Sequence, residues 1–574
     1  MNRQPVIHLF FSFLILQLFT ACAAVDQSSH TTLQADTLNS RELRSRALYQ
    51  YSLARMRLLE GDPDGALQLI SIALDEDPEA SYLYYAAAGI YLKTNRIQEA
   101  IVSAEKSAAI DPESRQAQML LANLFSLVKR YDDAVPHYLK AIDLDQSKED
   151  AYLHLSVAYV KTFEYDKAVS CLKKALGTDP DSVLVNYYLG KTYEQMKLSK
   201  EAIIYFKRAL ASKPDFEQAL IDLGISQESQ GLIDDAVATY RNLLDVNSGN
   251  STVRQHLIQL LIQNQRYEEA LHMLKVFSSV SGSGEETQRK IGLIYLELER
   301  YDEAIQVFNE LLAKSPDSWQ VRFYLASSYE GKELNDLALS EFLKIPATSP
   351  LYFESLSHCA YLYREKGDPD AGLALLKRAV DAKTGAVEPY LLLSRYYDSL
   401  GRSREGLNIL LGMVNEFPKD PRLFFNIGVL YDKLGNRDES ITMMKKVIQM
   451  APNDAQALNY LGYTYAEMGI HLEDALEYIS RALAVTPGDG FMLDSLGWVY
   501  YKMKKYDLAI VNLQRSLSII TDDPAIMEHL AEAYYANREY ENAISLYRKL
   551  IKIEPGKKEY AERMKKIRSE SGDR

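Results

Sequence analysis

The chain has 574 residues, of which 47% are hydrophobic and 25% are charged, so its composition is that of a folded, water-soluble protein. These proportions exclude wholesale disorder and a membrane protein with many spans. The 65 basic and 79 acidic side chains give a formal net charge of −14, which argues against a nucleic-acid binder with a broad basic face.

The first 21 residues have the order of features found in a secretory signal. Arg3 lies near the start, an apolar run extends from Leu9 to Phe19, and the small residues Thr20 and Ala21 follow. The run is short for a permanent transmembrane helix. We therefore expect this segment to act as a secretory signal.

The end of this segment, Leu18 to Cys22, resembles the bacterial lipobox, in which a signal peptidase cuts before a cysteine that then carries lipid. Phe19 departs from the aliphatic residue that the motif usually has three positions before the cysteine. The resemblance implies that residues 1–21 are a lipoprotein signal peptide and that Cys22 is the lipid attachment site. Ala23 stands where an Asp would favour the inner membrane, which implies the periplasmic face of a Gram-negative outer membrane. A plain signal peptide and a buried Cys22 thiol are the alternatives.

Residues 22–40 are rich in Ser, Thr, Asp and Gln and have no apolar period, which is typical of a flexible tether. After the tether, a small residue recurs at intervals close to 34 through fifteen units, and thirteen of the fifteen are alanine. These positions are Ala66, Ala100, Ala134, Ala168, Ala202, Ala236, Ala270, Ala304, Ala338, Ala371, Gly406, Ser440, Ala475, Ala509 and Ala543.

Two further positions keep the same register. Nine residues before the small residue, most units have an aromatic side chain, as at Tyr91 and Phe125. Twelve residues after it a proline is common, as at Pro78 and Pro214, and proline cannot continue a helix. The proline therefore ends the second helix in the units that have it.

This pattern resembles the tetratricopeptide repeat, a helix-turn-helix unit, over residues 47–555. The unit from Val183 to Pro214 has a near-complete consensus, including Gly190, Tyr193 and Ala202. The resemblance implies an all-α fold, an α–α superhelical solenoid of about fifteen units with a C-terminal capping helix. Small residues let helix A and helix B of one unit approach closely. Glycines are predicted at the left-handed turn between the two helices, at Gly231, Gly367, Gly401, Gly435 and Gly469.

The seventh unit departs from the pattern. Ile258 replaces a small residue, Leu261 replaces the aromatic one, and a run of Ser and Gly follows at residues 278–284. We interpret this unit as a joint between an N-terminal sub-solenoid, residues 41–284, and a C-terminal sub-solenoid, residues 285–556.

Two other features complete the predicted organisation. Residues 557–574 are expected to form a capping helix and a tail, because a terminal repeat needs a polar outer face. The prolines Pro346 and Pro350 shorten the connection between two helices.

No catalytic or metal-binding pattern is present in the sequence. The nine histidines are scattered, without H-E-x-x-H or a close cluster of ligands, and the three cysteines have no C-x-x-C spacing. Cys171 falls within a helix B and Cys359 takes the small-residue position of its unit, so both are interpreted as core thiols. The sequence therefore predicts a non-enzymatic protein with no catalytic residues, metal, cofactor or small-molecule substrate.

In this repeat family the A helices line the concave face, which is the expected protein-binding surface. The aromatic content of these helices increases toward the C-terminus, and aromatic side chains bury much area at little entropic cost. The alternative is that they only pack against neighbouring A helices. A Lys/Asn clamp for a C-terminal carboxylate is not assembled, since only Asn123 appears at the relevant place, with His154 in the next unit. The candidate binding residues are Phe425, Asn459, Tyr463, Phe491, Trp498, Tyr501 and Tyr535.

A narrower resemblance concerns residues 457–475, which carry one inserted residue, and residues 493–501. These stretches are similar to proteobacterial outer-membrane repeat lipoproteins, among them an adaptor of a periplasmic carboxyl-terminal processing protease. The resemblance implies a lipid-anchored scaffold that links such a protease to cell-wall hydrolase substrates, with periplasmic or envelope proteins as partners. An assembly factor for secretion, pilus or exopolysaccharide export is the alternative function.

Overall fold

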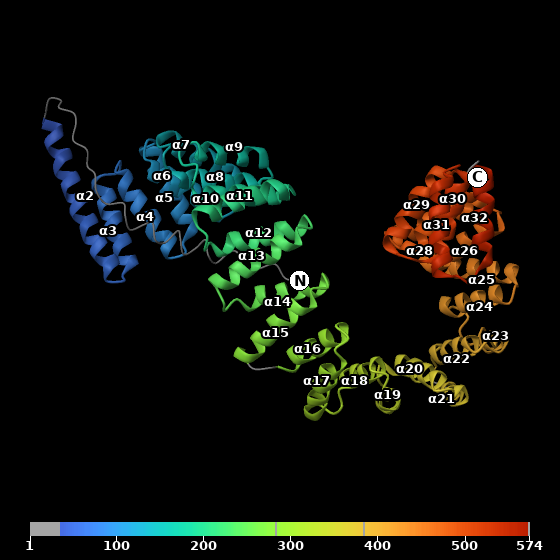
Figure 1. Cartoon of the computed structure of the whole chain (residues 1–574). Helices are drawn as coiled ribbons and strands as arrows, with labels where there is room; N and C mark the ends of the chain where they lie inside the picture. The colour runs from blue at the N-terminus through green and yellow to red at the C-terminus, as the bar shows by residue number, and fades with distance from the viewer. Residues whose placement is uncertain (1–34, 282–283, 383–384, 572–574) are drawn as a thin grey trace. The chain divides into compact units, whose positions relative to one another are not determined.

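The computed structural model describes residues 35–281, 284–382 and 385–571. Within these residues every regular element is a helix (Figure 1). The all-α fold expected from the sequence is confirmed. The predicted signal peptide and Cys22 lie outside the described residues.

The helices follow one another in fifteen antiparallel pairs, α2/α3 to α30/α31, and α32 comes last. In each pair the even-numbered helix is helix A and the odd-numbered one is helix B. The chain divides into two compact units, residues 1–273 and 274–574. We refer to them as unit 1 and unit 2.

Unit 1 is a stack of helix pairs in which, from α2 to α14, each helix packs against the next (Figure 1). Helix α15 (Tyr267–Ser281) crosses the boundary between the two units. The helices before it are α2 (Ala35–Leu59), α3 (Pro63–Glu76), α4 (Ser81–Lys93), α5 (Ile97–Ile110), α6 (Arg115–Leu127), α7 (Tyr131–Leu144), α8 (Glu149–Lys161), α9 (Tyr165–Leu176), α10 (Val183–Gln195), α11 (Ser199–Ser212), α12 (Glu217–Ser229), α13 (Ile233–Val246) and α14 (Ser251–Gln263).

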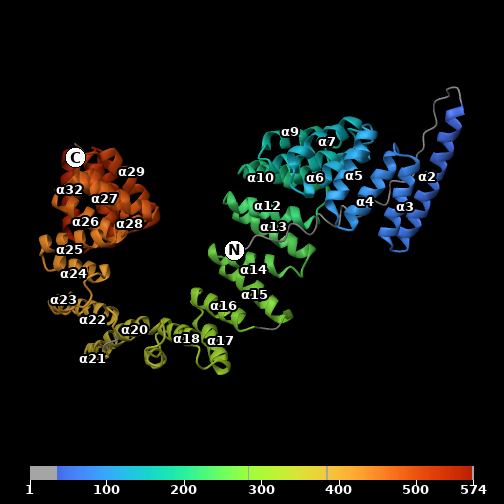
Figure 2. The same cartoon turned by 180° about the vertical axis from the view of Figure 1, so that it is seen from behind.

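Unit 2 continues the same alternation, and its last helices gather in one group (Figure 2). Its helices are α16 (Glu285–Glu297), α17 (Tyr301–Lys314), α18 (Trp319–Gly331), α19 (Asn335–Phe342), α20 (Tyr352–Glu365), α21 (Pro369–Asp381), α22 (Glu388–Ser399), α23 (Ser403–Gly412), α24 (Pro421–Lys433), α25 (Arg437–Met450), α26 (Ala455–Met468), α27 (Leu472–Val485), α28 (Gly490–Lys502), α29 (Tyr506–Ile519), α30 (Pro524–Ala536), α31 (Tyr540–Ile553) and α32 (Lys558–Ser571).

Helix A and helix B of a pair meet at small residues. Ala66, Ala100 and Ala134 are all completely buried. Where the small residue is Gly190 on α10, a Cβ atom added there would lie 2.5 Å from the ring of Phe206 on α11. The small residue is therefore a steric requirement of the close contact between the two helices.

The turn between helix A and helix B closes in the same way in successive pairs. At the end of α4, Asn95 has a left-handed φ of 59°, and the N–H of Arg96 donates to the carbonyl of Tyr91 at 2.8 Å. The same bond joins Arg130 to Phe125 at 2.8 Å. This is the hydrogen bond of a Schellman motif. The five glycines predicted at this turn all have positive φ, at Gly231, Gly367, Gly401, Gly435 and Gly469.

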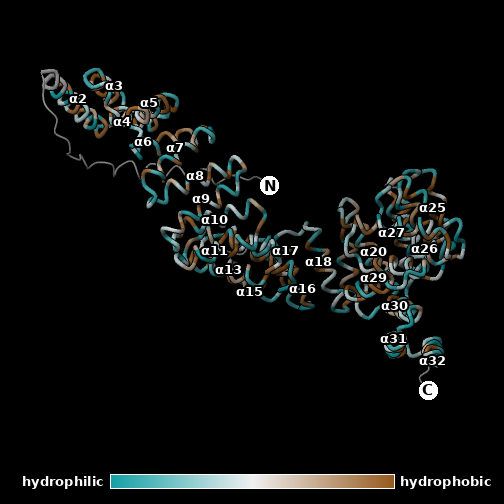
Figure 3. The backbone as a smooth tube through the Cα atoms, turned by 90° about the horizontal axis from the view of Figure 1, so that it is seen from above, coloured by the Kyte–Doolittle hydropathy of each residue, from teal (hydrophilic) through white to brown (hydrophobic). Residues whose placement is uncertain are grey.

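The A helices form the inner layer of each unit. Wherever helices two apart in the chain make substantial contact among the described residues, both of them are A helices. Examples are α8 with α10 in unit 1 and α26 with α28 in unit 2. Because helices on the inside of a curved stack are closer together, the A helices line its concave side. Figure 3 shows apolar and polar residues alternating along the helices, as expected when each helix buries one face.

Two local departures have clear causes. Helix α19 has only 8 residues and ends at Phe342, shortly before Pro346. The sequence predicts a tether that extends to Ser40, whereas α2 begins at Ala35. Residues 35–40 contain neither Gly nor Pro, so the helix can extend through them. None of the described helices is both long and apolar enough to cross a membrane.

The steric requirement at the A–B contact leads to a matched pair of substitutions. Gly190→Ala places a methyl group against Phe206, and we expect a loss of about 1–3 kcal/mol in stability. Gly89→Ala on α4 is the control, because a Cβ atom there meets nothing within 4 Å, and it should stabilise its helix by up to about 1 kcal/mol. Thermal unfolding and hydrogen exchange of α10 and α11 measure both effects. Unchanged exchange in Gly190→Ala would contradict the requirement for a small residue.

Candidate protein-binding surface

Four successive A helices, α24, α26, α28 and α30, belong to the C-terminal end of the inner layer. Among them, α26 contacts α28 and α28 contacts α30 directly. An aspartate caps the start of each of these four helices: Asp420 caps α24, Asp454 accepts from the N–H of Ala457, and Asp489 accepts from the N–H of Met492. Asp523 caps α30 in the same way. These caps fix where each helix begins, and therefore which side chains face the concave side.

A stack of three rings joins α28 to α30. The Trp498 ring lies between Tyr501, with centroids 4.6 Å apart and planes 7° apart, and His529, with centroids 4.1 Å apart and planes 18° apart. The indole N–H of Trp498 donates to the carboxylate of Glu467 on α26. Three neighbouring A helices are thus connected through one indole ring.

A carboxylate on the neighbouring helix restrains the ring of His529. Its Nδ1 lies 2.9 Å and 3.1 Å from the two carboxylate oxygens of Asp494 on α28. Asp494 is 8% exposed, so this pair is largely shielded from water. A buried carboxylate that binds a ring nitrogen restrains the orientation of the imidazole, and this keeps the His529 ring parallel to Trp498.

Further side chains border the stack. The Tyr463 ring centroid lies 6.4 Å from that of His529, and the Lys502 ammonium lies 4.9 Å from the centre of the Trp498 ring. Burial raises the pKa of Tyr463 and of Tyr501 above the ordinary tyrosine value. Both hydroxyl groups therefore stay protonated at neutral pH and remain able to donate hydrogen bonds.

A second cluster connects α30 to the last helix, α32. The Arg563 guanidinium lies 4.4 Å from the centre of the Tyr535 ring and binds the carboxylate of Glu532 through two nitrogens. The hydroxyl of Tyr547 donates to the same carboxylate. This bidentate pair attaches α32 to the end of the inner layer.

The structure distributes the seven predicted residues over several places. Trp498 and Tyr463 lie beside His529, Tyr501 stacks on Trp498, and Tyr535 lies beside Arg563.

The other three predicted residues stand apart from this group. Phe425 instead contacts Tyr460 on the neighbouring α26, with ring centroids 6.0 Å apart. Phe491 is 60% exposed and lies two helical turns before Trp498 on α28. The side-chain oxygen of Asn459 is buried and has no hydrogen-bond partner within the described part of the chain.

Inspection of single helices misses His529, Asp494 and Glu467. Asp494 and His529 are 35 residues apart, and Glu467 and Trp498 are 31 apart. Both separations are close to one repeat, so residues on consecutive A helices become neighbours. A search for polar and aromatic pairs at this spacing could have found them.

The inner layer of unit 1 has a different character. The hydroxyl of Tyr187 donates to Asp222 at 2.8 Å, and the Lys191 ammonium lies 3.3 Å from the same carboxylate. Asn123 accepts a hydrogen bond from Tyr138 at 2.8 Å, and the His154 ring stacks on Tyr138. These groups bind one another across neighbouring helices and hold those helices together.

The two described cysteines have the properties of core thiols. Cys171 and Cys359 are buried, and burial raises the pKa of each thiol to about 12. A thiol that stays protonated is a poor nucleophile. Among residues 35–281, 284–382 and 385–571, no group of three His, Cys, Asp or Glu side chains is arranged to hold a metal ion.

Comparison with known families identifies the repeats. Models described as tetratricopeptide repeat match residues 57–124, 119–152, 153–215, 221–274, 289–352, 421–454 and 526–559. The chain is a tetratricopeptide repeat protein. Helix pairs of the same kind also occupy residues 353–420 and 455–525, between the matched segments. Every matching model is a tetratricopeptide repeat model, and none belongs to a catalytic family.

No curated protein matches the sequence. Among solved structures, the repeat array is similar to Naa15/Naa10 bound to HypK-THB, with 13% identity, coverage of 91% of this chain and 96% of the other, and a TM-score of 0.38. It is also similar to the APC/C hetero-tetramer Cut9-Hcn1, with 15% identity, coverage of 85% and 96%, and a TM-score of 0.37. MamA matches with 27% identity over 28% of this chain and 94% of the other, with a TM-score of 0.27.

The link between α30 and α32 can be tested by removing one charge. Glu532→Gln leaves Arg563 without its anionic partner, and we expect a loss of about 1–3 kcal/mol in the local stability of α32. Hydrogen exchange of residues 558–571 should become faster. Glu559→Gln, an exposed position on α32, is the control and should leave this exchange unchanged. Equal exchange in both variants would show that another contact holds α32.

Proposed function

We propose that this tetratricopeptide repeat protein is a non-enzymatic scaffold, anchored by lipid at Cys22, that binds protein segments on the concave side of α26, α28 and α30. The observation that carries the proposal is the stack of Trp498 between Tyr501 and His529. Aromatic side chains dominate the binding energy of protein interfaces, because they bury large areas and lose little rotamer freedom.

The polar groups around the stack also support a binding role. The indole N–H of Trp498 and the Nδ1 of His529 already have carboxylate partners. A ligand that covers the rings therefore does not leave these groups without hydrogen bonds, which would cost about 1–3 kcal/mol for each group. An apolar side chain of a partner can therefore cover these rings without breaking their hydrogen bonds.

The charges favour a basic partner. Helices α26, α28 and α30 carry four acidic side chains and one lysine, Lys502. The whole chain has a net charge of −14. Glu528 and Glu532 are paired with Lys557 and Arg563, and Asp494 is buried, so the exposed carboxylate of Glu467 is the one beside the rings that can attract a Lys or Arg side chain. The acidic residues are Glu467, Asp494, Glu528 and Glu532.

We further propose that the partners are envelope proteins: a processing protease and the cell-wall hydrolases that it cleaves. The support is the resemblance of residues 457–475 and 493–501 to outer-membrane repeat lipoproteins of proteobacteria. In this role the chain joins enzyme and substrate without chemistry of its own. Its location would be the periplasmic face of the outer membrane.

Loss of the aromatic platform should abolish partner capture. Affinity purification from solubilised membranes with the native chain should recover a protease or another envelope enzyme. The Trp498→Ala and Phe491→Ala double variant should lose it, because removal of one central aromatic anchor costs about 2 kcal/mol or more, roughly a thirtyfold loss of affinity.

Trp319→Ala is the matched control, since it removes the other tryptophan of the chain and leaves α26 to α30 unchanged. It should retain the partner. Recovery of the same proteins with all three chains would contradict the assignment of the concave surface. Detectable turnover of a substrate by the purified chain would contradict the non-enzymatic role.

The lipid anchor has a separate test. Cys22→Ser removes the only thiol in the predicted lipobox, and we expect the chain to move from the membrane fraction to the soluble fraction. Fractionation followed by immunoblotting measures the distribution. Retention of the variant in membranes would contradict lipid attachment at Cys22.

A further inference from the structure

The first helix of the described residues, α2, exposes positions that the next A helix, α4, buries. In α4, Leu83 and Ile90 are 0% and 3% exposed. The residues at the same register of α2, which lie 34 positions earlier, are Tyr49 and Met56. They are 63% and 57% exposed. In α4 the preceding helix pair covers these positions, whereas no described helix pair precedes α2.

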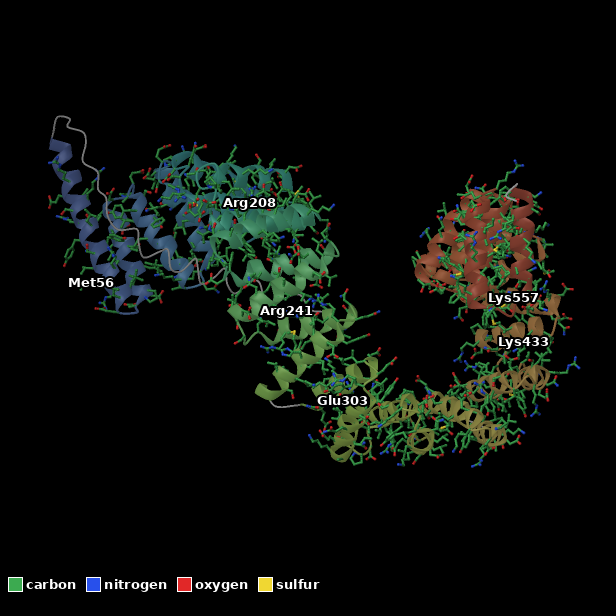
Figure 4. The ribbon with its side chains drawn as sticks, viewed as in Figure 1. Met56, Arg208, Arg241, Glu303, Lys433 and Lys557 are labelled. Atoms are coloured by element: carbon green, nitrogen blue, oxygen red, sulfur yellow. The ribbon has the colours of Figure 1, made fainter. Side chains whose placement is uncertain are left out.

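Two leucines extend this exposed surface. Leu48 is 52% exposed and Leu59 is 86% exposed. The four residues are separated by intervals of 1, 7 and 3, so they lie on one side of the helix. Figure 4 labels Met56 on the first helix pair. We define the outer face of α2 as Leu48, Tyr49, Met56 and Leu59.

Arginines surround the outer face. Helix α2 carries five arginines and two acidic residues, Asp36 and Glu42, a net charge of 5 − 2 = +3 in a chain of net charge −14. Arg57 lies 3.5 Å from Glu60 and 3.9 Å from Asp62, just after the helix. All five arginines are exposed: Arg41, Arg44, Arg46, Arg55 and Arg57.

The ion pairs that these arginines make lie at the surface. Arg46 lies 2.8 Å from Glu42, Arg44 lies 3.7 Å from Asp77, and the side chains of these two arginines are 59% and 72% exposed. Exposed pairs of this kind contribute about 0–1 kcal/mol. The arginines can therefore exchange these partners for another anion at little cost.

We propose that the outer face of α2 lies on an anionic lipid surface. Leu48, Met56 and Leu59 would enter the boundary between headgroups and acyl chains, and the flanking arginines would bind lipid phosphates. Apolar side chains beside arginines on one helix are the combination that holds a helix in the plane of a membrane interface. The guanidinium group suits phosphate because it donates in a planar fork.

The position of α2 in the chain supports this occupant. Ala35, the first residue of α2, follows Cys22 by 13 residues, a span of at most about 45 Å for an extended chain. The proposal that α2 contacts lipid rests on the proposed membrane location of the chain. It does not depend on the proposed binding of proteins by α26, α28 and α30. A lipid anchor together with a basic, apolar helix gives two attachments, and a single acyl chain alone binds only weakly.

A second copy of the chain is a less favourable partner for the outer face of α2 than a lipid surface is. Two copies that pack through α2 would bring two sets of five arginines together, and like charges repel. Helix α32 at the other end of the array also carries an excess of basic residues, with five Lys or Arg against three Glu. Contact of α2 with the α32 of another copy would therefore oppose charges of the same sign.

A polarity-sensitive fluorophore tests the proposal in the full chain carrying Cys22→Ser. The label is attached at Met56→Cys, and the control label at Ile204→Cys, a position on α11 that is 52% exposed. Cys171 and Cys359 are buried and do not compete. Vesicles of phosphatidylcholine alone are compared with vesicles that also contain phosphatidylglycerol.

We expect the Met56→Cys label to shift to shorter wavelength only with phosphatidylglycerol, and the Ile204→Cys label to show no shift. Arg44→Glu with Arg55→Glu should abolish the shift while the circular dichroism spectrum stays unchanged. An equal shift at both labels, no shift at Met56→Cys, or a shift independent of phosphatidylglycerol would overturn the proposal. A concentration-dependent shift without vesicles would assign the face to a second copy. Partner capture by the concave surface is measured separately and does not depend on these outcomes.

Discussion

At the contact between helix A and helix B of most pairs there is room for only a small side chain, because a bulky residue of helix B lies against that point. Phe206 fills the space beside Gly190, and Leu513 fills the space beside Gly497. This close approach lets each pair present a continuous apolar face to the next pair. The array can then grow without a central core, since every pair is buried by its neighbours.

The same arrangement explains why the polar contacts of the inner layer have their particular spacing. Residues on consecutive A helices become neighbours at separations close to one repeat, as for Asp494 with His529 and Glu467 with Trp498. In unit 1 these cross-helix contacts bury their own polar groups, as for Asp222. At the C-terminal end they leave a half-exposed stack of rings, and there we propose that the inner layer binds a partner.

The apolar residues at the two ends of the described array differ in how they are covered. At one end, α32 closes the last pair with Tyr560 and Ile567 buried and with charged residues outside. At the other end, α2 has apolar residues at positions that the preceding pair covers elsewhere. An uncovered apolar stripe beside arginines has a physical explanation if a lipid surface covers it in the way that a preceding pair covers α4.

The sequence by itself determined the helix pairs, their period and the left-handed turns, because these depend on side-chain size and backbone freedom within one repeat. It also placed Trp498, Tyr501 and Tyr463 on A helices. Only the tertiary structure decided that Trp498 and Tyr463 meet at His529 while Phe425 pairs with Tyr460, since such contacts depend on how consecutive helices are aligned. It also decided that α2 begins at Ala35 with an exposed apolar face, because exposure at the end of an array depends on which neighbour is present.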